Sequence, residues 1–163
     1  MDKFMKVNDP TFLVAMASML SNLNISDYNP QLEQLMTSSK DAKVKSSILD
    51  ALVALKHNEI EKIIKLAMED DNRNVRTTAL KYLGELDISK ENLPGIVEPI
   101  FEKGTTREQQ QTVQVLGEMP LDKTSEILEL TDVKPLVGHI SGKRANTHWI
   151  TFLKQQSQEA QQC

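Results

Sequence analysis

The sequence has few of the residues that build disulfide-linked or sheet-rich proteins. Aromatic residues make up only 4% of the 163 residues, so a core must consist of Leu, Ile, Val, Ala and Met. That composition favours helix packing over a sheet sandwich. The single cysteine, Cys163, cannot form an intramolecular disulfide, so no oxidising compartment is implied. Glycine and proline are scarce, with six of each. We therefore expect a helical protein located in the cytoplasm.

Long hydrophobic runs are also missing. The apolar run Thr11–Leu20 is too short to cross a bilayer, which takes about 20 residues. An export signal is an alternative interpretation, because Ala15 and Ala17 resemble a small-residue cleavage site. Asp2 precedes the run and Pro10 stands where a helix would start, and both argue against this alternative. We expect neither export nor a membrane-embedded segment.

A positive charge excess is absent as well. The chain carries 19 basic and 23 acidic residues, a formal net charge of −4. A protein that neutralises many phosphates needs a basic face, so this balance argues against a dedicated nucleic-acid binder. With 39% hydrophobic and 26% charged residues, the composition is that of a globular chain with the length of one domain.

What the sequence does contain is an internal repeat. Residues 71–86 have a close variant upstream at 41–55 and a partial one downstream at 112–119. Each copy closes on an apolar pair three residues apart, namely Leu20/Leu23, Leu52/Leu55, Leu83/Leu86 and Leu116/Met119. Successive closings lie 32, 31 and 33 residues apart. A helical period of about 30 to 45 residues is typical of an α-solenoid, in which each helical hairpin must stack on a neighbour.

The repeat resembles the HEAT-like, armadillo-type helical repeat family. The best-matching copy carries the resemblance through Asp71, Val75, Arg76, Ala79, Leu80, Leu83, Gly84 and Leu86. The upstream copy matches more loosely through Asp41, Val44, Lys45, Leu49, Leu52 and Leu55. The third copy departs from the pattern, because Glu108 and Gln109 replace its Val and Arg. The resemblance implies that Arg76 belongs to a structural ladder between repeats, paired with an acid such as Asp41 or Asp71.

We therefore predict an all-α fold with one domain spanning residues 1–163. It is an α-solenoid of about four HEAT-like hairpins with a C-terminal capping helix. The hairpins are expected at 10–38, 39–69, 71–103 and 105–131, and the capping segment at 133–160. The stripes expected to face inward are Val44, Ile48, Ala51, Leu52 and Leu55, and then Val75, Ala79, Leu80, Tyr82, Leu83 and Leu86.

Local signals mark where some of these helices begin and end. Asp41 can cap the helix that follows it, and Thr105 followed by Glu108 resembles a capping box. Gly104 is expected to end the preceding helix. Pro99 lacks a backbone donor and should bend that helix.

The residues that could carry chemistry are few. His57, His139 and His148 are scattered without a metal-binding spacing, so we interpret them as surface or capping residues and expect no metal. No nucleophile motif or phosphate-binding loop occurs, so we expect no enzyme activity and no cofactor. The corner 142–144 with Trp149 could contact phosphate, although a solvated turn with a core tryptophan is the plainer interpretation.

A binding surface is the remaining candidate. The second helices of successive hairpins are expected to line a concave face, with Glu59, Lys62, Lys65, Glu69, Glu98 and Glu102 projecting from it. Such a wall suits a peptide or a partner helix. We predict a non-catalytic protein-interaction or scaffold module. The alternatives are a nucleic-acid-binding HEAT-like protein, a helper or lyase for a prosthetic group, and a regulatory segment of a larger assembly.

Overall fold

The computed structural model describes residues 7, 9–120, 122–124 and 127. The described residues form helices, turns and loops without any strand. The chain divides into two compact units, unit 1 (Met1–Leu86) and unit 2 (Asp87–Cys163), which we describe separately. The single repeat domain stays a prediction. The capping segment 133–160, with His139, His148 and Trp149, lies outside the described residues.

Most of the described helices lie in unit 1. They are α1 (Pro10–Asn22), the 3₁₀ turn η2 (Ser26–Tyr28), α2 (Asn29–Ser38), α3 (Ala42–Ala54), α4 (Ile60–Met68) and α5 (Arg73–Glu85). Unit 2 contains α6 (Leu93–Lys103) and α7 (Thr106–Glu118) among its described residues.

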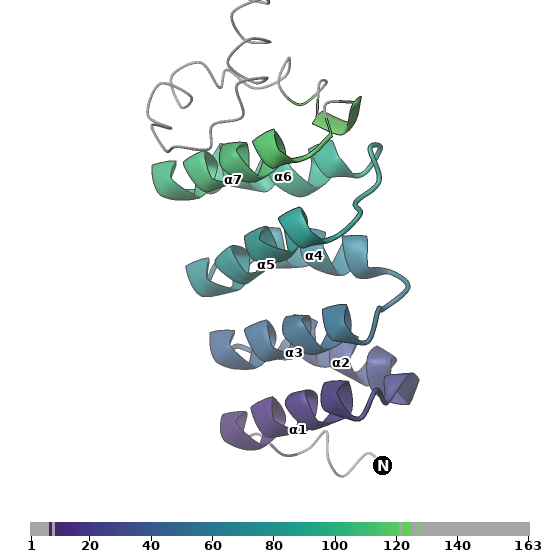
Figure 1. The fold of residues 1–163 in the computed structure, drawn as a ribbon. Coiled ribbons are helices and arrows are strands. Elements are labelled where there is room, and N and C mark those ends of the chain that lie inside the picture. The colour runs from purple at the N-terminus through teal and green to yellow at the C-terminus, as the bar shows by residue number, and fades with distance from the viewer. Residues whose placement is uncertain (1–6, 8, 121, 125–126, 128–163) are drawn as a thin grey trace, which may run out of the picture. The chain divides into compact units, whose positions relative to one another are not determined.

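Unit 1 is a stack of helices in two layers. The helices α1, α3 and α5 succeed one another in one layer, with α2 and α4 behind them (Figure 1). The central helix α3 packs against α1, α2, α4 and α5. The largest fully buried side chains of this unit are Leu32, Ile48, Leu49, Leu52, Ile63, Ile64, Met68, Leu80 and Leu83. The stack confirms the predicted all-α solenoid, with a core of aliphatic residues and methionine.

The first helix of each pair in unit 1 begins at a side-chain cap. The Oδ1 atom of Asp41 accepts hydrogen bonds from the backbone N–H groups of Lys43 and Val44, at 2.9 and 3.0 Å. Asp9 caps α1 and Asn72 caps α5 in the same manner. These bonds satisfy backbone donors that a helix N-terminus otherwise leaves unpaired.

Residues close in sequence also mark the helix ends in unit 2. Thr105 and Glu108 form the predicted capping box, in which Glu108 Oε2 accepts from the Thr105 backbone N–H at 2.9 Å. Gly104 follows the last residue of α6, as predicted. Helix α6 continues through Pro99, which contributes no backbone donor there. Beyond α7, Lys123 Nζ forms an ion pair with the Asp87 carboxylate.

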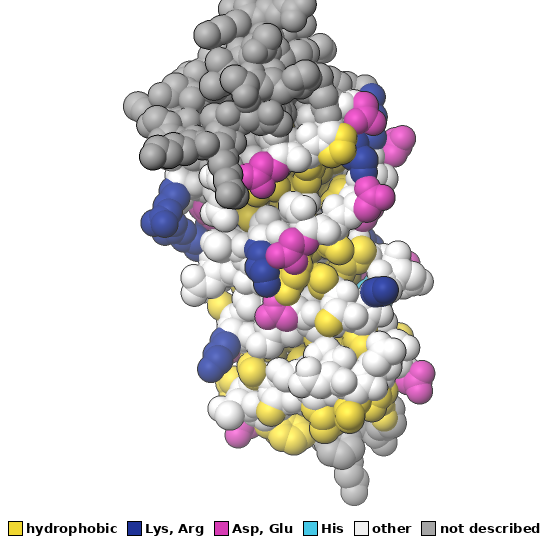
Figure 2. Space-filling view, viewed as in Figure 1, with side chains coloured by type: hydrophobic (Ala, Val, Ile, Leu, Met, Phe, Trp, Pro, Cys, Tyr) yellow, Lys and Arg dark blue, Asp and Glu magenta, His cyan; other side chains and the backbone are white. Residues whose placement is uncertain are grey.

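Helix α1 buries less of its apolar surface than its sequence pattern suggests. Its buried residues are Leu13, Ala17 and Leu20. Met19 and Leu23 belong to the same apolar pattern, but they are 52% and 61% exposed. Figure 2 shows hydrophobic side chains gathered over this helix. The amphipathic spacing thus predicts the helix correctly and overstates how much of it is covered within unit 1.

Candidate functional site

The predicted binding surface of unit 1 centres on the outward side of α4. Four residues face the core, namely Ile63, Ile64, Ala67 and Met68. The opposite side exposes Lys62, Lys65, Leu66 and Glu69, which we call the α4 face. The 3.6-residue helical period produces this division, because residues three or four apart share a side. Leu66 is 37% exposed, so an apolar side chain stands among three charged ones.

An ion-pair cluster connects α4 to α2 at one edge of the α4 face. Lys62 Nζ lies 2.8 Å from Glu59 Oε2 and 3.2 Å from Glu33 Oε1. The hydrogen bond from Lys62 lowers the pKa of Glu59, and the bond to Glu59 raises the pKa of Lys62. Lys62 is 60% exposed, so the cluster orients side chains more than it stabilises the fold.

His57 supports this cluster from the turn before α4. It is only 7% exposed, and its Nδ1 accepts a hydrogen bond from the Glu59 backbone N–H at 3.1 Å. The Nδ1 atom therefore carries no proton in this arrangement. Its Nε2 lies 4.0 Å from Glu33 Oε2. Of the two predicted roles for His57, capping is the one that the geometry matches.

The remaining predicted surface residues belong to unit 2. Glu98 and Glu102 are both exposed on α6, four residues apart and therefore on one side of that helix. Glu59, Lys65 and Glu69 are likewise exposed in unit 1. A common surface formed by these two groups stays a prediction.

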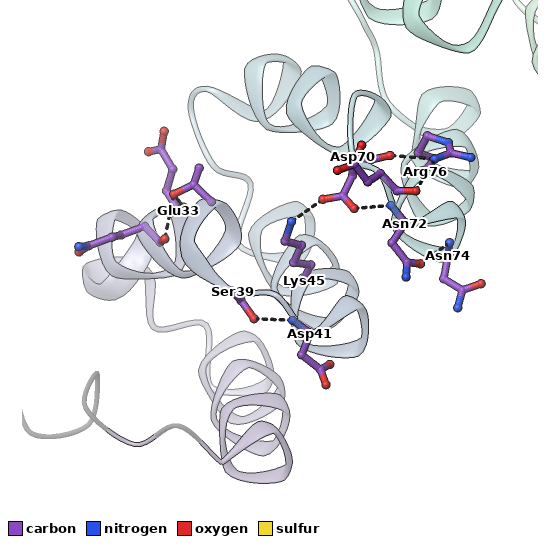
Figure 3. A network of polar contacts seen from close by, with 11 residues as sticks. Glu33, Ser39, Asp41, Lys45, Asp70, Asn72, Asn74 and Arg76 are labelled. Carbon is purple, nitrogen blue, oxygen red and sulfur yellow. Dashed lines mark hydrogen bonds and ion pairs between the residues drawn. The ribbon is translucent and has the colours of Figure 1, made fainter. Parts of the chain in front are cut away.

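Of the predicted ladder residues, Asp41 and Asp71 lie in loops that join successive pairs in unit 1, and Arg76 lies in the first turns of α5. Arg76 Nη1 donates to the carbonyl oxygens of Asp70 and Asp71, at 2.8 and 3.0 Å. The Asp41 carboxylate caps α3. An ion pair joins α3 to the loop before α5, where Lys45 Nζ lies 2.5 Å from Asp70 Oδ2, partly buried (Figure 3). The pairing of Arg76 with a carboxylate stays a prediction.

Further polar contacts join α3 to α5 at the repeat interval. Tyr82 Oη donates to Asp50 Oδ1 at 2.5 Å, and Thr78 Oγ1 lies 3.4 Å from Ser46 Oγ. Both pairs are separated by 32 residues, which is also a spacing of the sequence repeat. Burial, followed by the hydrogen bond to Asp50, raises the pKa of Tyr82 far above its ordinary value.

The described residues offer binding groups rather than a reactive centre. Within them, no three His, Cys, Asp or Glu side chains gather closely enough to hold a metal ion. No helix of the described part combines the length and apolar character needed to span a membrane. The polar groups described above serve as caps, ion pairs between helices, and exposed charges on helix surfaces.

The helical pairs of unit 1 are stacked, repeat at an interval near 32 residues and are joined by polar contacts at that interval. These features define an α-helical repeat protein. A family model described as HEAT repeats matches residues 29–117, which is more than half of the chain. The chain therefore belongs to the HEAT-repeat family. No curated protein and no solved structure matches it. HEAT repeats commonly mediate protein–protein interactions, and the family is generally of the non-catalytic scaffold type.

Proposed function

We propose that this protein is a non-catalytic interaction module that binds a peptide or a partner protein on the second-helix surface of its repeats. The observation that carries the proposal is the α4 face, where Leu66 is exposed among Lys62, Lys65 and Glu69. An apolar contact surrounded by charges of both signs resembles the centre and rim of a transient protein interface.

The α4 face also has a fixed framework, which supports the proposal. The cluster of Glu33, Glu59 and Lys62 links two helices, and His57 holds the backbone at the start of α4. A surface built on packed helices presents its side chains with little loss of backbone entropy on binding. An extended peptide or a helix of the partner fits such a surface.

Charge reversal on the α4 face tests the proposal. The double variant Lys62→Glu/Lys65→Glu should weaken capture of a specific partner by about tenfold or more, because rim charges steer association and repel mismatched partners. The matched control is Lys40→Glu/Lys43→Glu, which makes the same charge change at exposed positions outside α4. Both variants should retain the helical circular dichroism and thermal unfolding of the parent.

The measurement compares proteins that co-purify with the parent and with each variant, followed by titration of the purified candidate. A candidate that the α4 variant loses and the control keeps supports the proposal. Equal affinity for all three proteins contradicts it. The corresponding test in unit 2 is Glu98→Lys/Glu102→Lys, which we also expect to weaken binding. We further propose a cytoplasmic location, which fractionation of cells that express the chain would check.

A further inference from the structure

Leu66 differs from the other exposed hydrophobic side chains in what surrounds it. Within the described residues, the large hydrophobic side chains that stand exposed are Phe12, Met19, Leu23 and Leu66. The first three belong to or adjoin α1, whose 13 residues include no charged one. Leu66 lies in α4 beside exposed lysine and glutamate side chains. The charges of the α4 face can therefore select a partner, which a purely apolar patch does much less well.

The two lysines of the α4 face differ in what they already bind. Lys62 Nζ is shared between Glu59 and Glu33, at 2.8 and 3.2 Å. Lys65 and Glu69 are exposed, and neither side chain makes a hydrogen bond or ion pair with another described residue. They stand one helical turn apart, but a lysine that precedes a glutamate by four residues pairs less well than the reverse order. Lys65 and Glu69 thus offer one charge of each sign to a partner.

Glu69 is also unfavourably placed for the stability of its own helix. It is the C-cap residue of α4, where the last backbone carbonyl groups give the helix end a partial negative charge. The helix dipole opposes a carboxylate there, and no ion pair with a basic side chain of the described residues offsets this. A basic group of a partner would relieve the repulsion, so this position favours a base.

The spacing of these groups suits a partner helix. Lys65 and Glu69 are separated by about 6 Å along the axis of α4, and side chains one turn apart on a second helix have the same spacing. A helix also satisfies its own backbone hydrogen bonds. An extended peptide on a helix surface finds few backbone partners, because the backbone groups of α4 are already bonded within the helix.

Building on the proposed interaction function, we propose that the partner segment bound by the α4 face is an amphipathic helix of mixed charge. Its acidic side chain pairs with Lys65, a basic side chain one turn away pairs with Glu69, and an apolar side chain covers Leu66. Lys62 is a positioning residue in this arrangement, because its ion pairs within unit 1 fix its place beside the contact. A uniformly acidic or uniformly basic segment fits less well, since it meets a like charge at Glu69 or Lys65.

A library of helical peptides displayed on phage tests this chemistry on the full chain. The positions on one side of a fixed alanine-rich helix are randomised, and binders are selected on the parent and on Lys65→Glu/Glu69→Lys. Binders of the parent should carry an acid and a base one turn apart beside an apolar residue. Binders of the exchanged variant should carry the same charges in the opposite order. Binders without this pair, an order that the exchange does not reverse, or no binders at all would overturn the proposal.

Titration of one selected peptide measures the size of each contribution. Lys65→Ala and Glu69→Ala should each weaken binding by about two- to fivefold, the range for an exposed ion pair. The control Lys43→Ala, at an exposed position outside α4, should leave binding unchanged. Lys65→Glu/Glu69→Lys should weaken binding by about tenfold or more, and a peptide with its two charges exchanged should restore most of the loss. All variants should keep the circular dichroism spectrum of the parent.

The variant Leu66→Glu separates this inference from the proposed function. If it weakens the selected peptides by about tenfold or more while the charge exchange has no effect, the α4 face binds a partner but its charges do not select a helix of mixed charge. That result overturns the inference alone. If Leu66→Glu also leaves binding unchanged, the peptides bind elsewhere, and the result contradicts the proposed function of the α4 face as well.

Discussion

First helices and second helices of the repeat begin in different ways. In the described part, α1, α3, α5 and α7 each start at a residue whose side chain accepts a backbone hydrogen bond. The N-cap residues of α2, α4 and α6 make no such bond, and before α4 it is the His57 side chain that accepts a bond from the Glu59 backbone N–H. Proline occupies the first turn of α2 and α6, where its missing donor costs nothing.

The difference indicates where each kind of helix obtains its stability. A first helix is capped by a residue next to it in sequence, so a local hydrogen bond supplies part of its stability. Helix α4 spans only 9 residues and its N-cap residue Glu59 makes no side-chain cap bond, so it depends on burying one side against unit 1. Substitutions in the buried side of α4 should therefore cost more than removal of a cap from α3.

The sharpest test of this comparison is Ile64→Ala in α4. Ile64 is 0% exposed, so the change leaves a cavity and should lower the free energy of unfolding by about 2–5 kcal/mol. Chemical denaturation measures the loss. The control Leu66→Ala removes a similar side chain from the exposed side of the same helix and should cost less than about 1 kcal/mol. Equal losses would refute the dependence of α4 on packing.

Adding a side chain at the end of a second helix should lower stability by a smaller amount. A Cβ atom added at Gly104 would lie 2.4 Å from the carbonyl oxygen of Ile100, so the backbone at the end of α6 must shift. We expect Gly104→Ala to destabilise unit 2 by about 1–3 kcal/mol, seen as faster hydrogen exchange of α6 amides. Lys103→Ala, at an exposed neighbouring position, should stay within about 0.5 kcal/mol of the parent.

Removing a first-helix cap should have a moderate effect. Asp41→Ala leaves the N–H groups of Lys43 and Val44 without their acceptor and should cost about 1 kcal/mol. Glu59 stands at the corresponding place before α4 but makes no side-chain cap bond, so Glu59→Ala should not change stability measurably. Thermal unfolding of both variants checks the contrast. A larger loss for Glu59→Ala would reverse the comparison between first and second helices.

The local signals explain which parts of the fold could be predicted from sequence. The cap at Asp41, the capping box of Thr105 and Glu108, and the stop at Gly104 each act within a few residues, and the structure confirms all three. The buried stripe of α3 follows from helical periodicity and is likewise confirmed. The family resemblance also proved correct, because the match to HEAT repeats covers residues 29–117.

Contacts between helices were harder to predict because they depend on how the repeats stack. Lys45 and Asp70 are 25 residues apart, so neither helical periodicity nor the repeat interval points to their ion pair. Glu33 joins Lys62 and His57 only because α2 lies beside the start of α4. The pairs Ser46/Thr78 and Asp50/Tyr82 could have been found, since their spacing of 32 matches the repeat.

The last expected effect is comparable to the loss of a cap and concerns the contact of Tyr82 with Asp50, which joins two first helices. Tyr82→Phe removes this hydrogen bond and should lower stability by about 0.5–1.5 kcal/mol near neutral pH. Because the folded state raises the pKa of Tyr82 above its ordinary value of 10.0, the stabilisation is complete below that value and is lost as pH rises through the raised pKa. Denaturation should therefore show the parent losing stability above the ordinary pKa more steeply than Tyr82→Phe.

A companion variant separates the hydrogen bond from the charge. Asp50→Asn keeps an acceptor oxygen but removes the negative charge that helps to raise the pKa of Tyr82. Its alkaline loss of stability should begin at the same pH as in the parent, because the pKa of tyrosine in the unfolded chain sets the onset, but the total loss should be smaller because the folded state raises the pKa of Tyr82 less. If the parent and both variants lose the same amount of stability above the ordinary tyrosine pKa, then the contact of Tyr82 with Asp50 does not make the stability of the fold depend on tyrosine ionisation.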